Sequence, residues 1–155
     1  MIAIVFIAIT LIATIIHVKA RRYTDRHQIA ETLLSYLLLI NFGVMGLLAA
    51  YSHVFNADEI ARNIGWPTGS PFQFEIGMTN LAIGVMCIGA YWKRGSYWMA
   101  AITMVTILFI GCFVGHIIQY QKGDTAPYNI GPLIWIGDLA APLLALGLYL
   151  YIRKR

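Results

Sequence analysis

The sequence predicts an all-α integral membrane protein whose five transmembrane helices form an antiparallel bundle. Of the 155 residues, 59% are hydrophobic and only 12% are charged, whereas about 25% of the residues of a soluble domain are charged. Several apolar runs reach the roughly 20 residues that a helix needs to cross a bilayer. The basic residues lie at the ends of these runs, so the net charge of +4 does not indicate binding to nucleic acid. We therefore expect a multi-pass protein of the cell membrane.

The positions of the basic residues indicate that the spans alternate in direction. We expect a single transmembrane domain over residues 1–155, with helices at about 2–18, 29–51, 71–92, 97–120 and 132–152. Nine of the 11 Lys and Arg residues follow the first span, follow the third span or lie in the C-terminal tail. The positive-inside rule then places the N-terminus outside and the C-terminus in the cytoplasm. The first span has its basic residues after it, which indicates an uncleaved span rather than a signal peptide.

The segment 53–64, between the second and third spans, is amphipathic. Phe55, Ile60 and Ile64 can share one face of a helix, while charged residues occupy the other. This pattern predicts a short helix that lies on the membrane surface. The alternative is a plain loop.

The segment 65–75 leads into the third span and is rich in turn-forming Gly and Pro. Ser70, followed by Pro71 and by Gln73 three positions after the serine, is typical of a helix start with a capping box. Glu75 then lies in the first two turns, where the helix dipole favours a carboxylate. This acid is either a solvated residue of the helix start or part of a polar site at the membrane edge.

Among the ionisable residues inside predicted spans, Glu75, His116 and Asp138 stand out, because such groups are costly in a membrane and point to function. They come from three different helices and share the outer leaflet in this topology, and a histidine at the outer end of the second span can join them. The candidate polar intramembrane cluster consists of Glu75, His116, Asp138, Asn80, Gln73, Gln119 and His53. The alternative is that Asp138 pairs with His116 or a tyrosine as a structural hydrogen bond.

The break expected in the last span lies next to its acid. Pro142 follows Asp138 by four residues and has no N–H, so the carbonyl of Asp138 loses its helical partner and the helix can kink there. A freed carbonyl beside a carboxylate is typical of cation and proton sites in membrane proteins.

His116 shares one helix face with Cys112 and Gln119. Together with the two acids of the cluster, these side chains offer ligands for zinc or iron. The spacing matches no recognised metal motif, and a packed histidine is the simpler interpretation. We therefore predict no metal site and no cofactor, while a metal or a quinone at the outer leaflet stays open as an alternative.

Small residues line faces of two spans. The first face consists of Gln73, Gly77, Asn80 and Gly84. The segment 111–115 of the fourth span begins and ends with glycine. Both patterns predict close contact between helices, and a groove for a quinone or a lipid is the alternative. Asn41, in the middle of the second span, is expected to form a hydrogen bond to a neighbouring span.

Residues 33–89 resemble the DoxX-like membrane proteins. The resemblance rests on an apolar helix with Gly43 and Gly46, on the run ADEIARNIGWP at 57–67, and on a second apolar helix with an acid and glycines. It implies a small antiparallel four-helix bundle that acts as a membrane subunit beside a redox partner, in some members in thiosulfate or quinone oxidation. This chain adds an N-terminal span to that pattern.

The acid of the family's second helix corresponds to Glu75 or, by its distance from Gly84, to the position of Asn80. In the second case this chain lacks the acid. The segment 66–75 also resembles the signature of a family of small polytopic proteins that have no assigned function.

These features lead to three hypotheses about function. The first is a non-catalytic integral subunit or interaction protein, in contact with a membrane protein partner or in a homo-oligomer, and associated with a membrane redox system. The second is a small carrier or a proton or ion pathway that uses Glu75, His116 and Asp138. The third is a membrane enzyme with a metal or quinone, although the chain carries no HExxH motif, nucleophile elbow or phosphate loop.

Overall fold

The structure is a computed structural model that describes residues 2–154, and all the regular secondary structure in this range is helical. The elements in order are α1 (Ile2–Arg21), α2 (Arg26–Tyr36), η1 (Leu37–Val44), α3 (Met45–Phe55), α4 (Ala57–Ile64), α5 (Phe72–Gly89), α6 (Ser96–Gln121), α7 (Pro127–Ile130), η2 (Ile134–Ala140) and α8 (Ala141–Ile152). The segments η1 and η2 are π-helical. The helical structure confirms the all-α class, and five helical stretches are long and apolar enough to cross a membrane, which agrees with the predicted number of spans.

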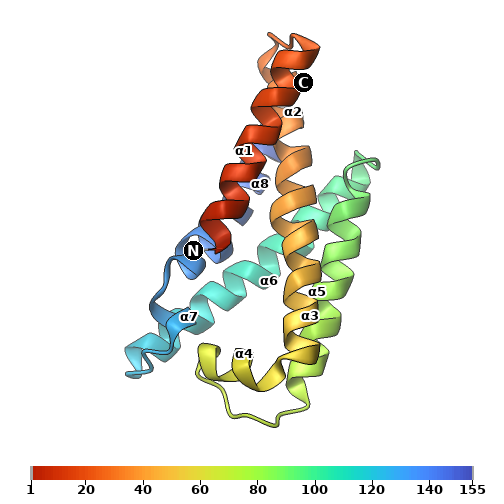
Figure 1. Ribbon diagram of the computed structural model, residues 1–155. Coiled ribbons are helices and arrows are strands. Elements are labelled where there is room, and N and C mark those ends of the chain that lie inside the picture. The colour runs from red at the N-terminus through yellow and green to blue at the C-terminus, as the bar shows by residue number, and fades with distance from the viewer. Residues whose placement is uncertain (1, 155) are drawn as a thin grey trace.

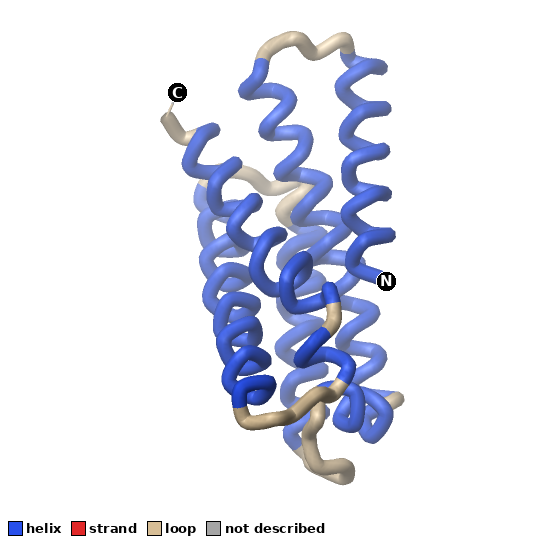
Figure 2. Tube along the Cα trace, turned by 90° about the vertical axis from the view of Figure 1, so that its left-hand side faces the viewer, coloured by secondary structure: helices blue, strands red, loops and turns tan. Residues whose placement is uncertain are grey.

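Successive long helices run in opposite directions along the bundle (Figures 1 and 2). The turns at 22–25 and 90–95 and the end of α8 lie toward one end of the molecule, which we call the basic end. Its described basic residues are Lys19, Arg21, Arg22, Arg26, Lys93, Arg94, Arg153 and Lys154. Helices α4 and α7 lie toward the other end, which we call the distal end.

Helix α1 packs on the continuous stretch of α2 and η1, and most of its large apolar side chains stay exposed. Asn41 Nδ2 donates to Thr10 Oγ1 over 2.5 Å, which joins η1 to α1. This hydrogen bond confirms that Asn41 reaches a neighbouring span. Such a hydrogen bond helps to hold two helices together in a membrane, because apolar surface in lipid supplies no hydrophobic force between helices.

Glycines bring α3 and α5 into close contact. A Cβ atom on Gly46 would lie 2.9 Å from Gly84 Cα, and one on Gly77 would lie 2.7 Å from Val54 Cγ2. These distances confirm that the small-residue face of α5 packs against a helix. In α6, by contrast, a Cβ atom on Gly111 or Gly115 would meet no described atom within 4 Å. The prediction that this motif packs closely against another helix is therefore wrong for the helices of the same chain.

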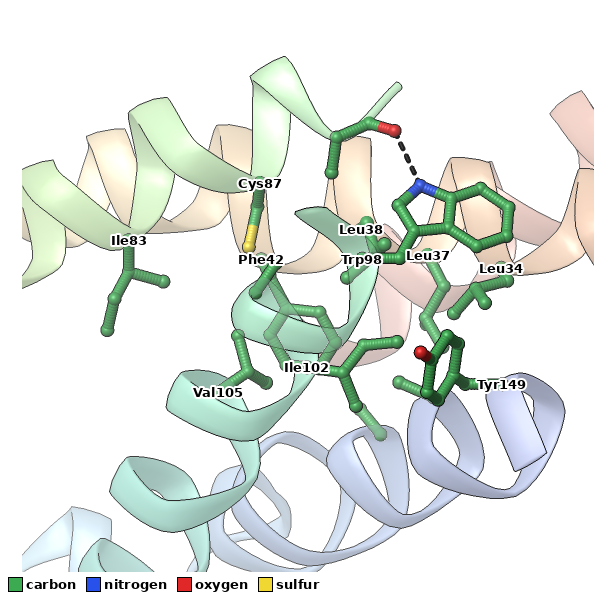
Figure 3. Packing of buried hydrophobic residues seen from close by; sticks show 14 residues of the cluster. Leu34, Leu37, Leu38, Phe42, Ile83, Cys87, Trp98, Ile102, Val105 and Tyr149 are labelled. Atoms are coloured by element: carbon green, nitrogen blue, oxygen red, sulfur yellow. Dashed lines mark hydrogen bonds between the residues drawn. The ribbon is translucent and has the colours of Figure 1, made fainter. Parts of the chain in front are cut away.

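The apolar core lies between the two ends of the bundle (Figure 3). It combines fully buried side chains of α2 and η1, of α5 and of α6, among them Leu38, Phe42, Ile102 and Val105. Trp98 closes the core near the basic end, where its Nε1 donates to the carbonyl of Ala90 over 2.6 Å. The core thus separates the polar groups of the two ends.

Several local predictions differ from the structure. Helix α3 continues to Phe55, so the surface helix α4 begins at Ala57 and not at residue 53. The predicted capping box of α5 forms only in part: Ser70 Oγ accepts a hydrogen bond from the backbone N–H of Phe72 over 3.3 Å, but Gln73 does not complete the box. The side chain of Gln73 is buried inside the bundle next to His53, so its amide does not reach back to the first residue of the helix. Helix α7 occupies part of what the sequence indicated as a polar loop.

Candidate functional site

A group of polar side chains in contact with one another lies toward the distal end, between α6, α7 and η2. His116 Nε2 of α6 lies 3.9 Å from Asp138 Oδ2 of η2, and the two side chains are only 13% and 10% exposed. Both residues belong to stretches that can cross a membrane. The structure therefore places two of the three ionisable candidates side by side.

The backbone around Asp138 is π-helical, and Pro142 follows directly after this stretch and the next residue, Ala141. The ring of Pro142 supplies no N–H to the preceding turn, and the N–H of Ala141 reaches back five residues to the carbonyl of Ile136. The predicted kink is thus a wider turn, Ile134–Ala140, that ends just before the proline. Such turns in helices occur frequently at functional sites.

Asn129 of α7, which the sequence did not single out, connects this site to the rest of the distal end. It is 2% exposed. Its Oδ1 lies 2.6 Å from His116 Nδ1, while its Nδ2 donates over 3.4 Å to the carbonyl of Ile64 and over 3.4 Å to Gln119 Oε1. The only feature of the sequence that pointed to Asn129 is its place between Pro127 and Gly131, directly before a span. Polar residues in turns usually do not connect buried groups.

These partners define the hydrogen positions on the imidazole. Asn129 Nδ2 faces two acceptors, so Asn129 Oδ1 faces His116 and accepts from its Nδ1–H. His116 Nε2, which is left to face Asp138, has no hydrogen in the neutral ring. At 3.9 Å, His116 Nε2 and Asp138 Oδ2 are close enough for charge attraction but too far apart for a direct hydrogen bond.

The other candidates lie outside this pair. His53 Nδ1 of α3 lies 2.6 Å from Gln73 Oε1 of α5, and Gln73 is 1% exposed. Asn80 Nδ2 donates over 3.0 Å to the carbonyl of Ile76 in its own helix. Glu75 is exposed, and its carbonyl accepts a hydrogen bond from Thr79. The seven candidate residues thus divide into three sets. His116, Gln119 and Asp138 form one group, and His53 and Gln73 form a separate pair. Glu75 and Asn80 lie apart from both.

A hollow of about 240 Å³ adjoins Asn129 at the distal end. Its other lining residues are Ile117, Tyr120, Ile130, Ile134 and Trp135. This lining combines apolar side chains with the polar groups of Asn129 and Tyr120. Within residues 2–154 no three His, Cys, Asp or Glu side chains converge on a position for one metal ion.

Outside the spans, Tyr128 of α7 lies near Glu59 of α4. Burial, and secondly the negative charge of Glu59, raise the pKa of the Tyr128 phenol above its ordinary value. The phenol is thus kept neutral where α4 and α7 meet.

A family model described as a family of unknown function, DUF6790, matches residues 1–155. The chain belongs to this family. The match over the whole length is consistent with the resemblance to small polytopic proteins without an assigned function, and it shows no link to the DoxX-like proteins. No curated protein and no solved structure is significantly similar to this DUF6790 chain.

Proposed function

We propose that the protein is a non-catalytic interaction protein of the cell membrane that assembles through α6, with its N-terminus outside and its C-terminus in the cytoplasm. One observation carries the proposal. The small-residue motif of α6, Gly111 to Gly115, opens onto the outside of the bundle, where a Cβ atom on either glycine would meet nothing within 4 Å. In membranes such motifs let two helix backbones approach closely.

The partner that fits this surface best is α6 of a second copy. Two identical small-residue faces complement each other across a twofold axis, since each glycine pair accommodates the opposite backbone. The surface continues along the helix to Ile107, which is 70% exposed and lies one turn before Gly111. A subunit of a membrane redox complex is the alternative partner, and the experiment below separates the two.

The core supports an interaction role over a transport path through a single chain. Leu34, Leu38, Phe42, Ile102 and Val105 are fully buried or nearly so, in the region that separates the polar groups of the two ends. A proton or ion that crosses this region needs water or polar groups at every step. The packed apolar side chains offer neither, and the nearby polar pair of Asn41 and Thr10 is engaged in its own hydrogen bond.

Cysteine cross-linking in native membranes tests the α6 interface. The variant Ile107→Cys is made in a Cys112→Ser background, where the remaining Cys87 is fully buried. We expect an oxidant to convert this variant to a species of twice the chain mass. Substitution of Gly111 and Gly115 by leucine should abolish that species.

Val85→Cys is the matched control, because Val85 is an exposed apolar residue of α5 in the same bundle. Mass spectrometry of the cross-linked product identifies its second chain. If the second chain in the product is another membrane protein, that protein and not a second copy is the partner of α6. Cross-linking no stronger at Ile107 than at Val85 would refute the proposal.

The second candidate function, a carrier or proton pathway, rests on the His116–Asp138 pair alone. Its test is proton or ion flux into liposomes that contain the purified protein. Asp138→Asn should abolish the flux, whereas Glu75→Gln should leave it unchanged because the exposed Glu75 lies apart from the pair. Equal flux in wild type and Asp138→Asn would eliminate this function.

A further inference from the structure

A second polar cavity lies at the basic end, remote from the α6 motif and from the His116–Asp138 pair. It has a volume of about 190 Å³. Its lining comes from the last turns of α1, from α2 and from the turn that follows α5, namely His17, Tyr23, Gln28, Glu31, Thr32, Ser35, Tyr36, Tyr91 and Arg94. We propose that this cavity binds the zwitterionic head group of a phospholipid, with its phosphate on Arg94 and its ammonium on Glu31.

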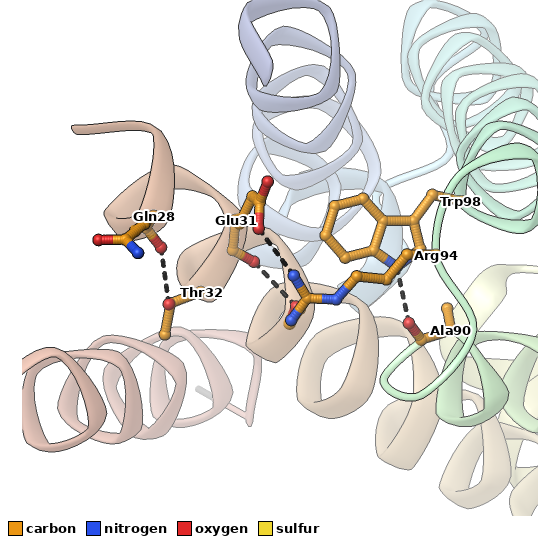
Figure 4. A network of polar contacts seen from close by, with 7 residues as sticks. Gln28, Glu31, Thr32, Ala90, Arg94 and Trp98 are labelled. Atoms are coloured by element: carbon orange, nitrogen blue, oxygen red, sulfur yellow. Dashed lines mark hydrogen bonds and ion pairs between the residues drawn. The ribbon is translucent and has the colours of Figure 1, made fainter. Parts of the chain in front are cut away.

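The cavity contains one fixed charge of each sign. Arg94 Nη1 lies 2.7 Å from Glu31 Oε2, and the guanidinium lies over the ring of Trp98 at 5.2 Å from the centroid (Figure 4). A guanidinium has five N–H donors, so further donors of Arg94 stay available to phosphate oxygens. A plain anion at this position would be repelled by Glu31. A ligand that also carries an ammonium group satisfies both side chains.

Aromatic rings form a wall beside this charged pair. The ring centroids of Tyr23 and His17 are 6.0 Å apart, those of His17 and Tyr36 are 5.7 Å apart, and those of Tyr36 and Tyr91 are 5.8 Å apart. Aromatic faces attract ammonium groups. The hydroxyl of Tyr36 is already engaged with His17 Nδ1 over 3.0 Å, so this wall contributes its ring faces.

The hydroxyl groups on the floor of the cavity are already engaged. Thr32 Oγ1 donates to the carbonyl of Gln28 over 2.7 Å, and Ser35 Oγ donates to the carbonyl of Glu31 over 2.8 Å. Recognition is therefore left to the charged and aromatic side chains.

Size and position favour a lipid head group over a larger molecule. Pockets for drug-sized ligands have volumes of about 300–1,000 Å³, so a cavity of about 190 Å³ accepts a head group and leaves the chains outside. The cavity lies where the basic side chains collect, at the level expected for lipid phosphates. The exposed apolar face of α1 beside it, which includes Ile12 and Ile16, offers a surface for the acyl chains.

Native mass spectrometry of the full chain in detergent tests this site with short-chain lipids of equal acyl length. The probes are phosphatidylethanolamine and phosphatidylcholine, which are zwitterionic, and phosphatidylglycerol, which carries a net negative charge. We expect at least one zwitterionic lipid to bind about tenfold more tightly than phosphatidylglycerol, since phosphatidylglycerol offers no ammonium to Glu31, so that Glu31 and the lipid phosphate compete for the single cation Arg94. Equal or tighter binding of phosphatidylglycerol would overturn the proposal.

Two variants and one control locate the binding. Arg94→Gln should weaken every lipid about tenfold by removing a charged hydrogen bond, and Glu31→Gln should remove the preference for zwitterionic lipids. Lys93→Gln removes a cation from the same turn, but Lys93 does not line the cavity, so its binding should equal that of wild type. The side chains of Arg94 and Glu31 are 52% and 38% exposed, and loss of such a solvated ion pair should leave the fold intact.

Soluble phosphoethanolamine and phosphocholine separate a lipid from a free metabolite. If the lipid is the ligand, these head groups compete only at concentrations far above those of the lipids. If a soluble head group competes at the same concentration as the lipids, the cavity still recognises a phosphate and an ammonium, but its ligand is a soluble molecule. Unchanged lipid binding in both Arg94→Gln and Glu31→Gln would refute the site.

Discussion

The contact between α3 and α5 makes a sharp prediction about a single methyl group. In Gly46→Ala, the new methyl carbon would lie 2.9 Å from Gly84 Cα, 3.0 Å from Gly84 N and 3.1 Å from Asn80 O. These are backbone atoms, so the contact is relieved only if the two helices separate. Overpacking of this kind costs about 1–3 kcal/mol. The higher helix propensity of alanine returns at most about 1 kcal/mol, so we expect a net loss of about 1–2 kcal/mol.

Gly147→Ala in α8 is the matched control, because a Cβ atom there meets nothing within 4 Å in the described part of the chain. It should be neutral or stabilising by up to about 1 kcal/mol. The free energy of unfolding of both variants is measured by reversible denaturation in mixed micelles with increasing dodecyl sulfate. Equal stability of Gly46→Ala and Gly147→Ala would refute the close packing of α3 on α5.

Three further changes test individual contacts. Asn41→Leu removes the hydrogen bond to Thr10 and should lower the free energy of unfolding by about 0.6–1.7 kcal/mol; an unchanged value would mean that this bond does not hold α1. Asn129→Leu leaves its buried partners unsatisfied and should cost about 1–3 kcal/mol, with faster hydrogen exchange in α7 as the second readout. Exchange as slow as in wild type would contradict that role. Burial and Glu59 raise the pKa of Tyr128, so the unfolded chain loses this proton first and stability falls as the pH rises above about 10. Tyr128→Phe should remove that part of the fall, and an identical pH profile would show that Tyr128 does not cause it.

Part of the candidate site was predictable, and the reasons are local. His116 and Asp138 stood out because a charged group inside an apolar run is costly wherever the helix packs. Pro142 marked the place where regular α-helical hydrogen bonding ends, since a missing N–H acts on its own turn. The π-helical form of that turn depended on the surroundings.

Other parts of the site depended on contacts between distant segments. Asn129 looked like a turn residue, and its burial results from contacts with α4 on one side and α6 on the other. Gln73 fitted a capping box, but its buried amide lies next to His53 of α3. In both cases a contact with a residue remote in the sequence, and not the local turn or capping preference, decided where the side chain lies.

The sequence by itself determined the protein class, the number of candidate spans and their alternation, because apolar length and the positions of basic residues are properties of the chain in order. Only the tertiary structure decided which face of each helix meets which neighbour. A helical repeat places Gly111 and His116 on defined faces of α6, but it does not say which face turns inward. The packing of α6 against η2 and α7 turned His116 toward Asp138 and left Gly111 open to the outside. Helix rotation is settled by many contacts between residues far apart in the chain, and for that reason the site and the interaction surface emerged only from the fold.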